Sequence, residues 1–190
     1  MPRLTRLRLA VAVLVAGIAA VSGAAVVAAQ DAPSASGALE IPLNDGQGAR
    51  IGTVDVVPSG RTLDITVRTR GVLRTGFHGF HIHAAGRCEA PTFMSAGPHF
   101  ERPGQDHGQH AADLPTVLVK ANGTALLRVT TDLVTLAELR DSDGAAFIVH
   151  LGRDNQANIP SRYGQPDKDT LDTGDSGGRA ACGVVPPAGG

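Results

Sequence analysis

The sequence contains seven histidines, and all of them lie between positions 78 and 150. A single histidine in a core is usually structural, but seven in one span suggest chemistry, and imidazole nitrogen is a common transition-metal ligand. His81 and His83 alternate within the stretch from Phe77 to Ala84, so in a β-strand they point to the same side. The spacing therefore predicts two imidazoles that can bind a metal from one face of a strand.

The alternation in this strand separates its histidines into two groups. We expect Phe80 and Ile82 to face the core together with His78, which we interpret as a hydrogen-bonded core histidine. His81 and His83 then face outward, where a neighbouring loop must cover them.

A second strand, between residues 146 and 151, supplies another ring. The alternate residues that we expect to enter the core are Phe147, Val149 and Leu151. His150 then lies on the outer face, so the two strands offer three imidazoles on one side of a sheet.

The loop after the first strand adds four candidate ligands: His99, His107, His110 and Asp113. Three imidazoles and one carboxylate are a typical tetrahedral zinc set, and the glycines and prolines between them let the backbone bend. The strand histidines suit copper, which prefers tetragonal nitrogen coordination. The alternative is an ordinary solvated polar loop, which the nearby strand histidines make the weaker interpretation.

Proteins with different functions use similar residues. Cupins also carry a His-x-His pair but place a glutamate soon after it, and Glu89 lies too far beyond His83 for that pattern. A zinc hydrolase needs an open coordination position, whereas the four loop ligands fill the site. Two further functions stay open at this point: an exported copper-binding or copper-buffering protein without turnover, and a structural adhesion sandwich with an incidental metal.

Short strands must position these residues, because period-two alternation dominates the chain. Asn122 and Gly123 predict a two-residue hairpin between two of the strands. The pattern is typical of a β-sandwich or barrel. The strand candidates span residues 39–43, 49–57, 61–70, 77–84, 116–119, 124–129, 146–151 and 182–185.

The rest of the chain predicts one short helix and two long loops. Thr135 and Glu138 have the spacing of a capping box, so a helix should begin there. Residues 86–115 and 152–181 are too polar and too rich in glycine for a core, and we expect them to be irregular. Long loops in a compact domain often carry function.

The first 29 residues have the layout of a secretory signal, with Arg3, Arg6 and Arg8 before an uncharged Leu/Ala/Val stretch. The alternative is an uncleaved membrane anchor, because the stretch approaches spanning length. We predict a linker over 30–37, one domain over 38–186 and a flexible tail over 187–190. We therefore expect an exported protein in the periplasm, cell wall or extracellular space, without stable membrane association once the signal is removed.

The charge balance excludes one class of partner. The chain has 17 basic and 18 acidic side chains, and three of the basic ones lie in the predicted signal, so the remainder has a net charge of −4. Nucleic-acid binding is therefore not expected. Because the net charge is negative, an anionic substrate would have to be attracted by positive side chains close to the site.

Two cysteines, Cys88 and Cys182, occur in a chain whose predicted signal directs it to an oxidising compartment. One disulfide is the natural interpretation. The alternative, two free thiols that share a metal site, is weaker because no other cysteine accompanies them.

Two segments resemble the signatures of the copper,zinc superoxide dismutase family. Residues 76–83 (GFHGFHIH) followed by 95–100 (SAGPHF) resemble the first, and residues 174–185 (GDSGGRAACGVV) resemble the second. The resemblance extends from about Leu39 to Val185. It implies an all-β fold, a Greek-key β-sandwich or flattened barrel of about eight antiparallel strands with two long functional loops. The resemblance implies that superoxide is the substrate. It is also compatible with a homodimer.

Residue by residue, the resemblance implies a copper site and a zinc site that share one ring, His99. It matches Asp154 to a carboxylate that joins a copper ligand to a zinc ligand, Cys88 and Cys182 to an intrachain disulfide, and Arg179 to the active-site arginine. Copper would be held by His81, His83, His99 and His150, and zinc by His99, His107, His110 and Asp113.

The implied reaction disproportionates two superoxide anions to oxygen and hydrogen peroxide by Cu(II)/Cu(I) cycling. The resemblance implies that His99 and Arg179 are the catalytic residues: His99 would carry a proton to the product, and Arg179 would hold the anion. Asp172 lies where many eukaryotic members have a lysine that attracts the anion. We therefore expect weak attraction here, or attraction that depends on Arg153, Arg162 and Lys168.

Overall fold

The computed structural model describes residues 37–71 and 73–189. The predicted signal, nearly all of the predicted linker and the last residue of the predicted tail lie outside these residues. Within the described part of the chain, no helix is both long and apolar enough to cross a membrane.

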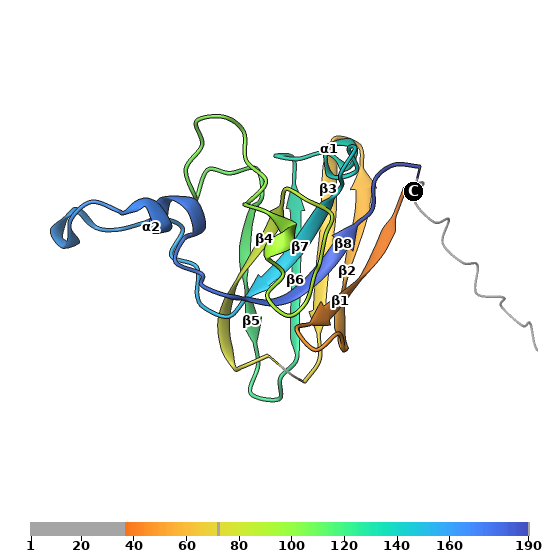
Figure 1. Ribbon diagram of the computed structural model, residues 1–190, viewed down its shortest axis with the longest axis horizontal. Coiled ribbons are helices and arrows are strands. Elements are labelled where there is room, and N and C mark those ends of the chain that lie inside the picture. The colour runs from red at the N-terminus through yellow and green to blue at the C-terminus, as the bar shows by residue number, and fades with distance from the viewer. Residues whose placement is uncertain (1–36, 72, 190) are drawn as a thin grey trace, which may run out of the picture. The chain divides into compact units, whose positions relative to one another are not determined.

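Eight antiparallel strands form one closed barrel in the order β1-β2-β3-β6-β5-β4-β7-β8 (Figure 1). The connections from β3 to β4 and from β6 to β7 each pass over two strands, which is the Greek-key arrangement. The fold prediction is thus confirmed. The bounds are β1 Leu39–Asp45, β2 Arg50–Ser59, β3 Thr62–Thr69, β4 Gly76–His83, β5 Asp113–Val119, β6 Ala125–Thr131, β7 Ala145–His150 and β8 Arg179–Val185.

Apolar side chains fill the barrel from alternate positions of its strands. In β3, Leu63, Ile65 and Val67 are buried while Asp64 and Arg68 are exposed, as period-two alternation predicts. Each fully buried aliphatic side chain contributes about 1.5–3 kcal/mol relative to leaving it in water. The barrel is therefore a stable wall on which outward-facing side chains can be held.

The turn between β5 and β6 is one residue longer than the predicted hairpin. Lys120 N–H donates to Thr124 O (2.9 Å), which leaves three residues in the loop, and Gly123 adopts a positive φ of 76°. A three-residue hairpin loop commonly ends with a glycine in the left-handed region.

The predicted capping box is present at α1, Leu136–Leu139. Glu138 N–H donates to Thr135 Oγ1 (3.3 Å), and Thr135 N–H donates to Glu138 Oε2 (2.7 Å). Hydrogen bonding from the Thr135 backbone lowers the pKa of Glu138. Just after the helix, Arg140 donates to the carbonyl oxygens of Pro186 and Pro187 (3.1 Å each), so hydrogen bonds reach into the predicted tail.

The two long loops are more structured than predicted. The second loop contains α2, Lys168–Thr173, and the 3₁₀ turn Ser161–Tyr163, while the first contains the 3₁₀ turn Met94–Ala96. Asp167 caps α2 through its side chain, which accepts from Thr170 N–H (3.0 Å). This cap was present in the sequence, but a six-residue helix is too short to show amphipathic periodicity.

A small second core lies under the first loop. It contains Phe93, Ala96, Ala146, Ile148 and the disulfide between Cys88 and Cys182, whose Cα atoms are 5.7 Å apart. The predicted disulfide is confirmed. The prediction that this loop is too polar to contribute to a core was wrong for Phe93, which is buried.

Candidate metal centre

β4 and β7 place three histidines outside the barrel but under the loops. His81 and His83 on β4 and His150 at the end of β7 are all buried. Phe80 and Ile82 fill the barrel, as predicted, whereas Leu151 is exposed, so its expected place in the core was wrong. β7 ends at His150, where a register shift against β8 interrupts the alternation.

His78 has the core role predicted for it. Its Nδ1 lies 2.7 Å from His150 O and its Nε2 lies 2.7 Å from Arg74 O. The ring thus joins β4 to the end of β7 and does not enter either ligand set.

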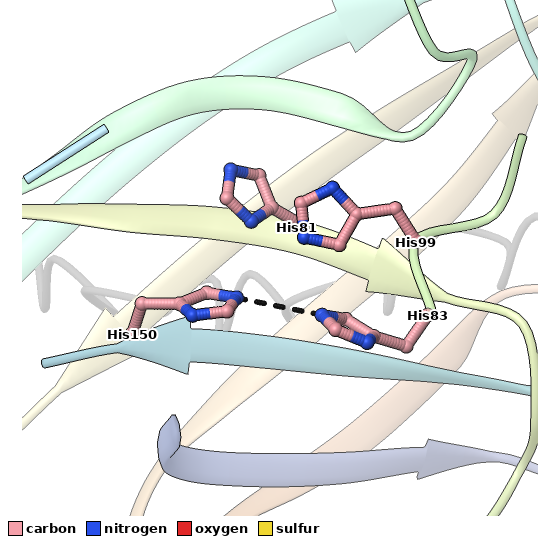
Figure 2. A group of neighbouring side chains, drawn as sticks. All are labelled: His81, His83, His99 and His150. Carbon is pink, nitrogen blue, oxygen red and sulfur yellow. Dashed lines mark hydrogen bonds between the residues drawn. The ribbon is translucent and has the colours of Figure 1, made fainter. Parts of the chain in front are cut away.

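The structure brings together the four predicted copper ligands, from β4, β7 and the first loop. One ring nitrogen from each of His81, His83, His99 and His150 lies within 4.8 Å of the others. Figure 2 shows the rings turned toward a common space, with His81 beside His99 and His83 beside His150. We call these four residues the copper set.

Two rings of this set are oriented by backbone carbonyls. His83 Nδ1 lies 2.9 Å from Gly97 O, and His150 Nδ1 lies 2.9 Å from Gly177 O. A carbonyl only accepts, so each Nδ1 carries the hydrogen and each neutral ring has its lone pair on Nε2. The two Nε2 atoms lie 3.4 Å apart, an arrangement that a bound cation stabilises.

The predicted zinc ligands also meet in one place. One atom from each of His99, His107, His110 and Asp113 lies within 4.8 Å of the others, and the three histidines are buried. Asp113 Oδ1 lies 3.1 Å from His107 Nδ1, 3.3 Å from His110 Nδ1 and 3.5 Å from His99 Nδ1. The loop is therefore not a solvated polar stretch. We call these four residues the zinc set.

His99 belongs to both sets and is the ring between them. Its Nδ1 faces Asp113, which leaves Nε2 for the copper set. Neither nitrogen has a hydrogen-bond partner among the described residues, although the ring is buried. Buried polar atoms rarely lack partners, so we interpret this ring as one that binds a metal ion through each of its two nitrogens.

Asp154 connects the two sets from behind, as the resemblance implied. Its Oδ2 lies 2.6 Å from His81 Nε2, and its Oδ1 lies 2.8 Å from His107 Nε2. Both rings therefore hold a hydrogen on Nε2 and turn Nδ1 toward a ligand site. His81 Nδ1 has no partner among the described residues.

The electrostatics of the two sets differ. Burial lowers the pKa of His83 to about 2, that of His150 to about 3 and that of His99 to about 4, and it also lowers the pKa of His81. Burial opposes charge on His107 as well, but the carboxylates of Asp113 and Asp154 outweigh it and raise its pKa to about 9.

The two carboxylates stay ionised. Burial alone would raise the pKa of each carboxyl group, but the neighbouring His107 lowers both, with further lowering from His99 at Asp113 and from His81 at Asp154. They therefore supply negative charge on the zinc side.

Arg179, at the start of β8, lies beside the copper set. Its Nη1 donates to Phe93 O and its Nη2 to Gly97 O, each at 2.6 Å. Gly97 O also accepts from His83, so one carbonyl orients both the arginine and a ligand ring. Burial lowers the pKa of Arg179, but arginine stays charged at any working pH.

A cavity of about 750 Å³ opens in front of the copper set. His83, His99, His150 and Arg179 line it, together with Lys168 and Asp172 from α2. Lys168 forms an ion pair with Asp172. Of the three bases expected to attract an anion, only Lys168 lines this cavity. The Arg162 guanidinium lies over the Tyr163 ring (4.7 Å to its centroid).

Sequence reasoning missed the groups that orient the ligands from the backbone. Gly97 O and Gly177 O carry no side-chain signal that could have identified them. Gly174 was also missed: a Cβ there would lie 2.2 Å from Asp154 Oδ1 and 2.3 Å from His107 Nε2. The signal that could have identified Gly174 is its position directly after α2, where glycine is the usual C-cap residue.

Comparison with known proteins gives one consistent result. The family model for Copper/zinc superoxide dismutase (SODC) matches residues 50–185. A superoxide dismutase (Cu-Zn) of Mycolicibacterium paratuberculosis is 40% identical over 177 residues, which cover 83% of this chain and 78% of the relative. Superoxide dismutase (Cu-Zn) 2 of Brassica juncea is 33% identical over 150 residues, or 75% of this chain and 93% of the relative.

Solved structures agree with this similarity. A SOD-like protein from Bacillus subtilis superposes with a TM-score of 0.64 at 30% identity, covering 77% of this chain and 97% of that one.

Proposed function

The chain belongs to the copper/zinc superoxide dismutase family, and we propose that its copper set, its zinc set and Arg179 together disproportionate superoxide to oxygen and hydrogen peroxide. The observation that carries the proposal is His99, whose two ring nitrogens are buried, lack hydrogen-bond partners in the described chain and face one ligand set each.

The donor atoms fit the two metals that the family implies. The copper set offers four imidazole nitrogens, which suit copper, and the zinc set offers three imidazoles and a carboxylate, which suit zinc. His81 Nδ1, both nitrogens of His99 and His107 Nδ1 are buried without hydrogen-bond partners in the described residues. When bound, copper supplies one-electron redox chemistry, and zinc, which has none, supplies fixed geometry and charge.

The chain's own residues bind and orient the substrate. Arg179 is held rigidly by Phe93 O and Gly97 O, and N–H groups that these carbonyls do not use can donate to superoxide. Guanidinium is planar and always charged, so it attracts and aligns a small anion. Arg179 is therefore placed to hold the anion next to His83 and His150.

His99 is the residue placed to move a proton to the product. Its Nδ1 faces Asp113, which leaves Nε2 on the side of the copper set, and the residue lines the cavity that Arg179 also lines. A proton held on Nε2 would thus lie on the substrate side. Asp154 keeps His81 and His107 in a single tautomer, so the rings on either side of His99 stay fixed while the proton moves.

Export belongs to the same proposal. The layout of residues 1–29 supports a secretory signal, and a disulfide such as Cys88–Cys182 persists in oxidising compartments. N-terminal sequencing of the protein recovered from the cell envelope or medium tests this: a start near Gln30 supports cleavage, and a start at Met1 contradicts it. Sedimentation of the same material decides between a monomer and a homodimer.

The central test combines metal analysis with a superoxide-consumption assay on the purified mature protein. We expect one copper and one zinc per chain and rapid loss of superoxide. Loading of only one metal would contradict the paired site, and full loading without superoxide loss would favour a copper-binding role without turnover.

Arg179→Ala tests the role of the arginine. Because Arg179 touches no ligand atom but orients the anion, the variant should keep both metals and lose about tenfold or more in rate. Arg61→Ala, an exposed arginine in the turn between β2 and β3, is the matched control. Loss of copper from Arg179→Ala would show a structural role instead.

A further inference from the structure

The cavity in front of the copper set is far larger than its substrate. Its volume is about 750 Å³, whereas one water molecule occupies about 30 Å³ and superoxide has only two atoms. The sites that bind organic ligands are typically about 300–1,000 Å³ in volume, so this cavity is large enough for one. Most of this wall is therefore not needed to hold superoxide.

Three apolar residues are part of this wall. Met94 is 67% exposed and Leu151 is 59% exposed, and both line the cavity together with Pro91. They are two of seven large apolar side chains that the described part of the chain leaves exposed. Small-molecule sites are lined mostly by apolar side chains with a few polar groups that fix the ligand's orientation.

Two of these apolar residues, Met94 and Leu151, belong to segments that contact Arg179 or the residue before it. Met94 follows Phe93, whose carbonyl oxygen accepts from Arg179 Nη1 (2.6 Å). Leu151 lies over Gly178, the residue before Arg179: a Cβ at Gly178 would be 3.0 Å from Leu151 Cδ1, and Leu151 N–H donates to Gly178 O (2.7 Å).

A smaller neighbouring cavity supports this arrangement. Pro91, Leu151 and Arg179 line it as well as the larger one, so the two cavities adjoin along these three residues. Arg179, Pro91 and Leu151 therefore lie at the edge that the two cavities share.

The charges of the cavity favour a negative group at Arg179. Its two hydrogen bonds go to backbone carbonyls, and no acidic side chain of the described residues lies within ion-pair distance of it. The acids that line the cavity are engaged elsewhere, since Asp172 pairs with Lys168 and Glu101 Oε2 lies 3.3 Å from His110 Nε2.

We propose that this cavity binds amphipathic monocarboxylates, of the size of an aryl carboxylate. The carboxylate pairs with Arg179, and the apolar body rests on Met94, Leu151 and Pro91. Because the carboxylate occupies the place of superoxide, such a ligand competes with the substrate. Only the competition with superoxide rests on the proposed function; the binding of the carboxylate does not.

The test measures binding of 1-naphthoate to the metal-loaded protein by titration calorimetry. Acetate has the same charge without the ring, and 1-naphthalenemethanol has the ring without the charge. We expect 1-naphthoate to bind at least about tenfold more tightly than either, because only it uses both parts of the site. Equal binding of acetate and 1-naphthoate would overturn the proposal.

Three variants locate the ligand. Leu151→Ser should weaken 1-naphthoate binding about fivefold by removing apolar contact, and Arg179→Gln should abolish its advantage over 1-naphthalenemethanol. Leu126→Ser, an equally exposed leucine that lines a different cavity, is the matched control and should bind normally. If Arg179→Gln does not fold, Arg179→Lys should weaken binding severalfold because it lacks the planar fork.

Superoxide consumption by the same preparations separates the two proposals. Wild-type protein that holds both metals but does not consume superoxide contradicts the proposed function and leaves the binding result standing. Unchanged 1-naphthoate binding in Leu151→Ser contradicts the present inference alone.

Discussion

The two ligand sets are built in different ways although they share His99. His81, His83 and His150 project from the ends of two neighbouring barrel strands, and backbone carbonyls or Asp154 orient their rings. His107, His110 and Asp113 come from the first loop or its junction with β5, and one carboxylate, Asp113, lies against all three zinc-set rings.

The two ligand sets should therefore differ in how they behave without metal. Strand-held rings keep their positions because the barrel core holds them, and burial keeps them neutral. The loop-held set carries charge, with His107 protonated between two ionised carboxylates. We therefore expect copper affinity to tolerate single substitutions around its site, whereas zinc affinity should depend strongly on individual side chains.

The largest expected effect is that of Asp113→Ala. Loss of the only carboxylate of the zinc set should lower zinc affinity by more than about 100-fold, whereas copper affinity should fall by less than about tenfold. Competition with chelators measures both affinities. Asp106→Ala, an exposed acid in the same loop, is the control, and equal loss of both metals from Asp113→Ala would break the comparison.

Gly174 and Gly177 form a matched pair in the second loop that tests the contact between Asp154 and His107. A methyl group at Gly174 would collide with the Asp154–His107 contact, whereas Gly177 has a similar positive φ (70° against 60°) and open space around it. Gly177→Ala should lose about 1–2 kcal/mol of stability from backbone strain, and Gly174→Ala at least as much because of the added collision, measured by thermal unfolding. Only Gly174→Ala should also lose at least about tenfold in zinc affinity, and equal zinc affinity in the two variants would argue against this role.

Proton release should also distinguish the sets. In the metal-free protein His107 has a pKa of about 9, so at pH 7 it is protonated and zinc must displace that proton. Zinc affinity should rise about tenfold from pH 7 to pH 8 and level off above pH 9. His83, His150 and His99, with pKa values of about 2, 3 and 4, are already neutral above pH 5, so copper added to the metal-free protein should release no proton between pH 5 and pH 9. Calorimetry in buffers of different ionisation enthalpy counts the protons, and equal release by both metals would contradict this prediction.

The smallest effect concerns the cavity wall. Asp172→Asn frees Lys168 from its ion pair, so the rate at low salt should rise by less than about threefold and fall more steeply as salt is added. Asp169→Asn, also on α2 but outside the cavity lining, is the control. A steep salt dependence already present in the unaltered protein would show that another positive group attracts the anion.

Much of the fold could be predicted because it depends on local signals. The alternation in β3, the Asn122–Gly123 turn and the Thr135–Glu138 cap each involve neighbouring residues. The errors arose where the residues adjacent in sequence do not determine whether a side chain is buried or whether a helix forms. Leu151 continues the apolar alternation of β7, yet it is exposed because the strand ends one residue earlier. α2 was missed because six residues are too few for a helical period.

The sequence alone determined which residues could bind metals, since imidazoles and a carboxylate at those positions, with the family's motifs around them, define the donor chemistry. It also determined that both cysteines could pair. Only the tertiary structure decided how His99 turns a different nitrogen to each set, which carbonyls orient His83 and His150, and why Leu151 and Met94 lie beside Arg179. Those features depend on distances between strands and loops that are far apart in the chain, and closing the barrel is what fixes those distances.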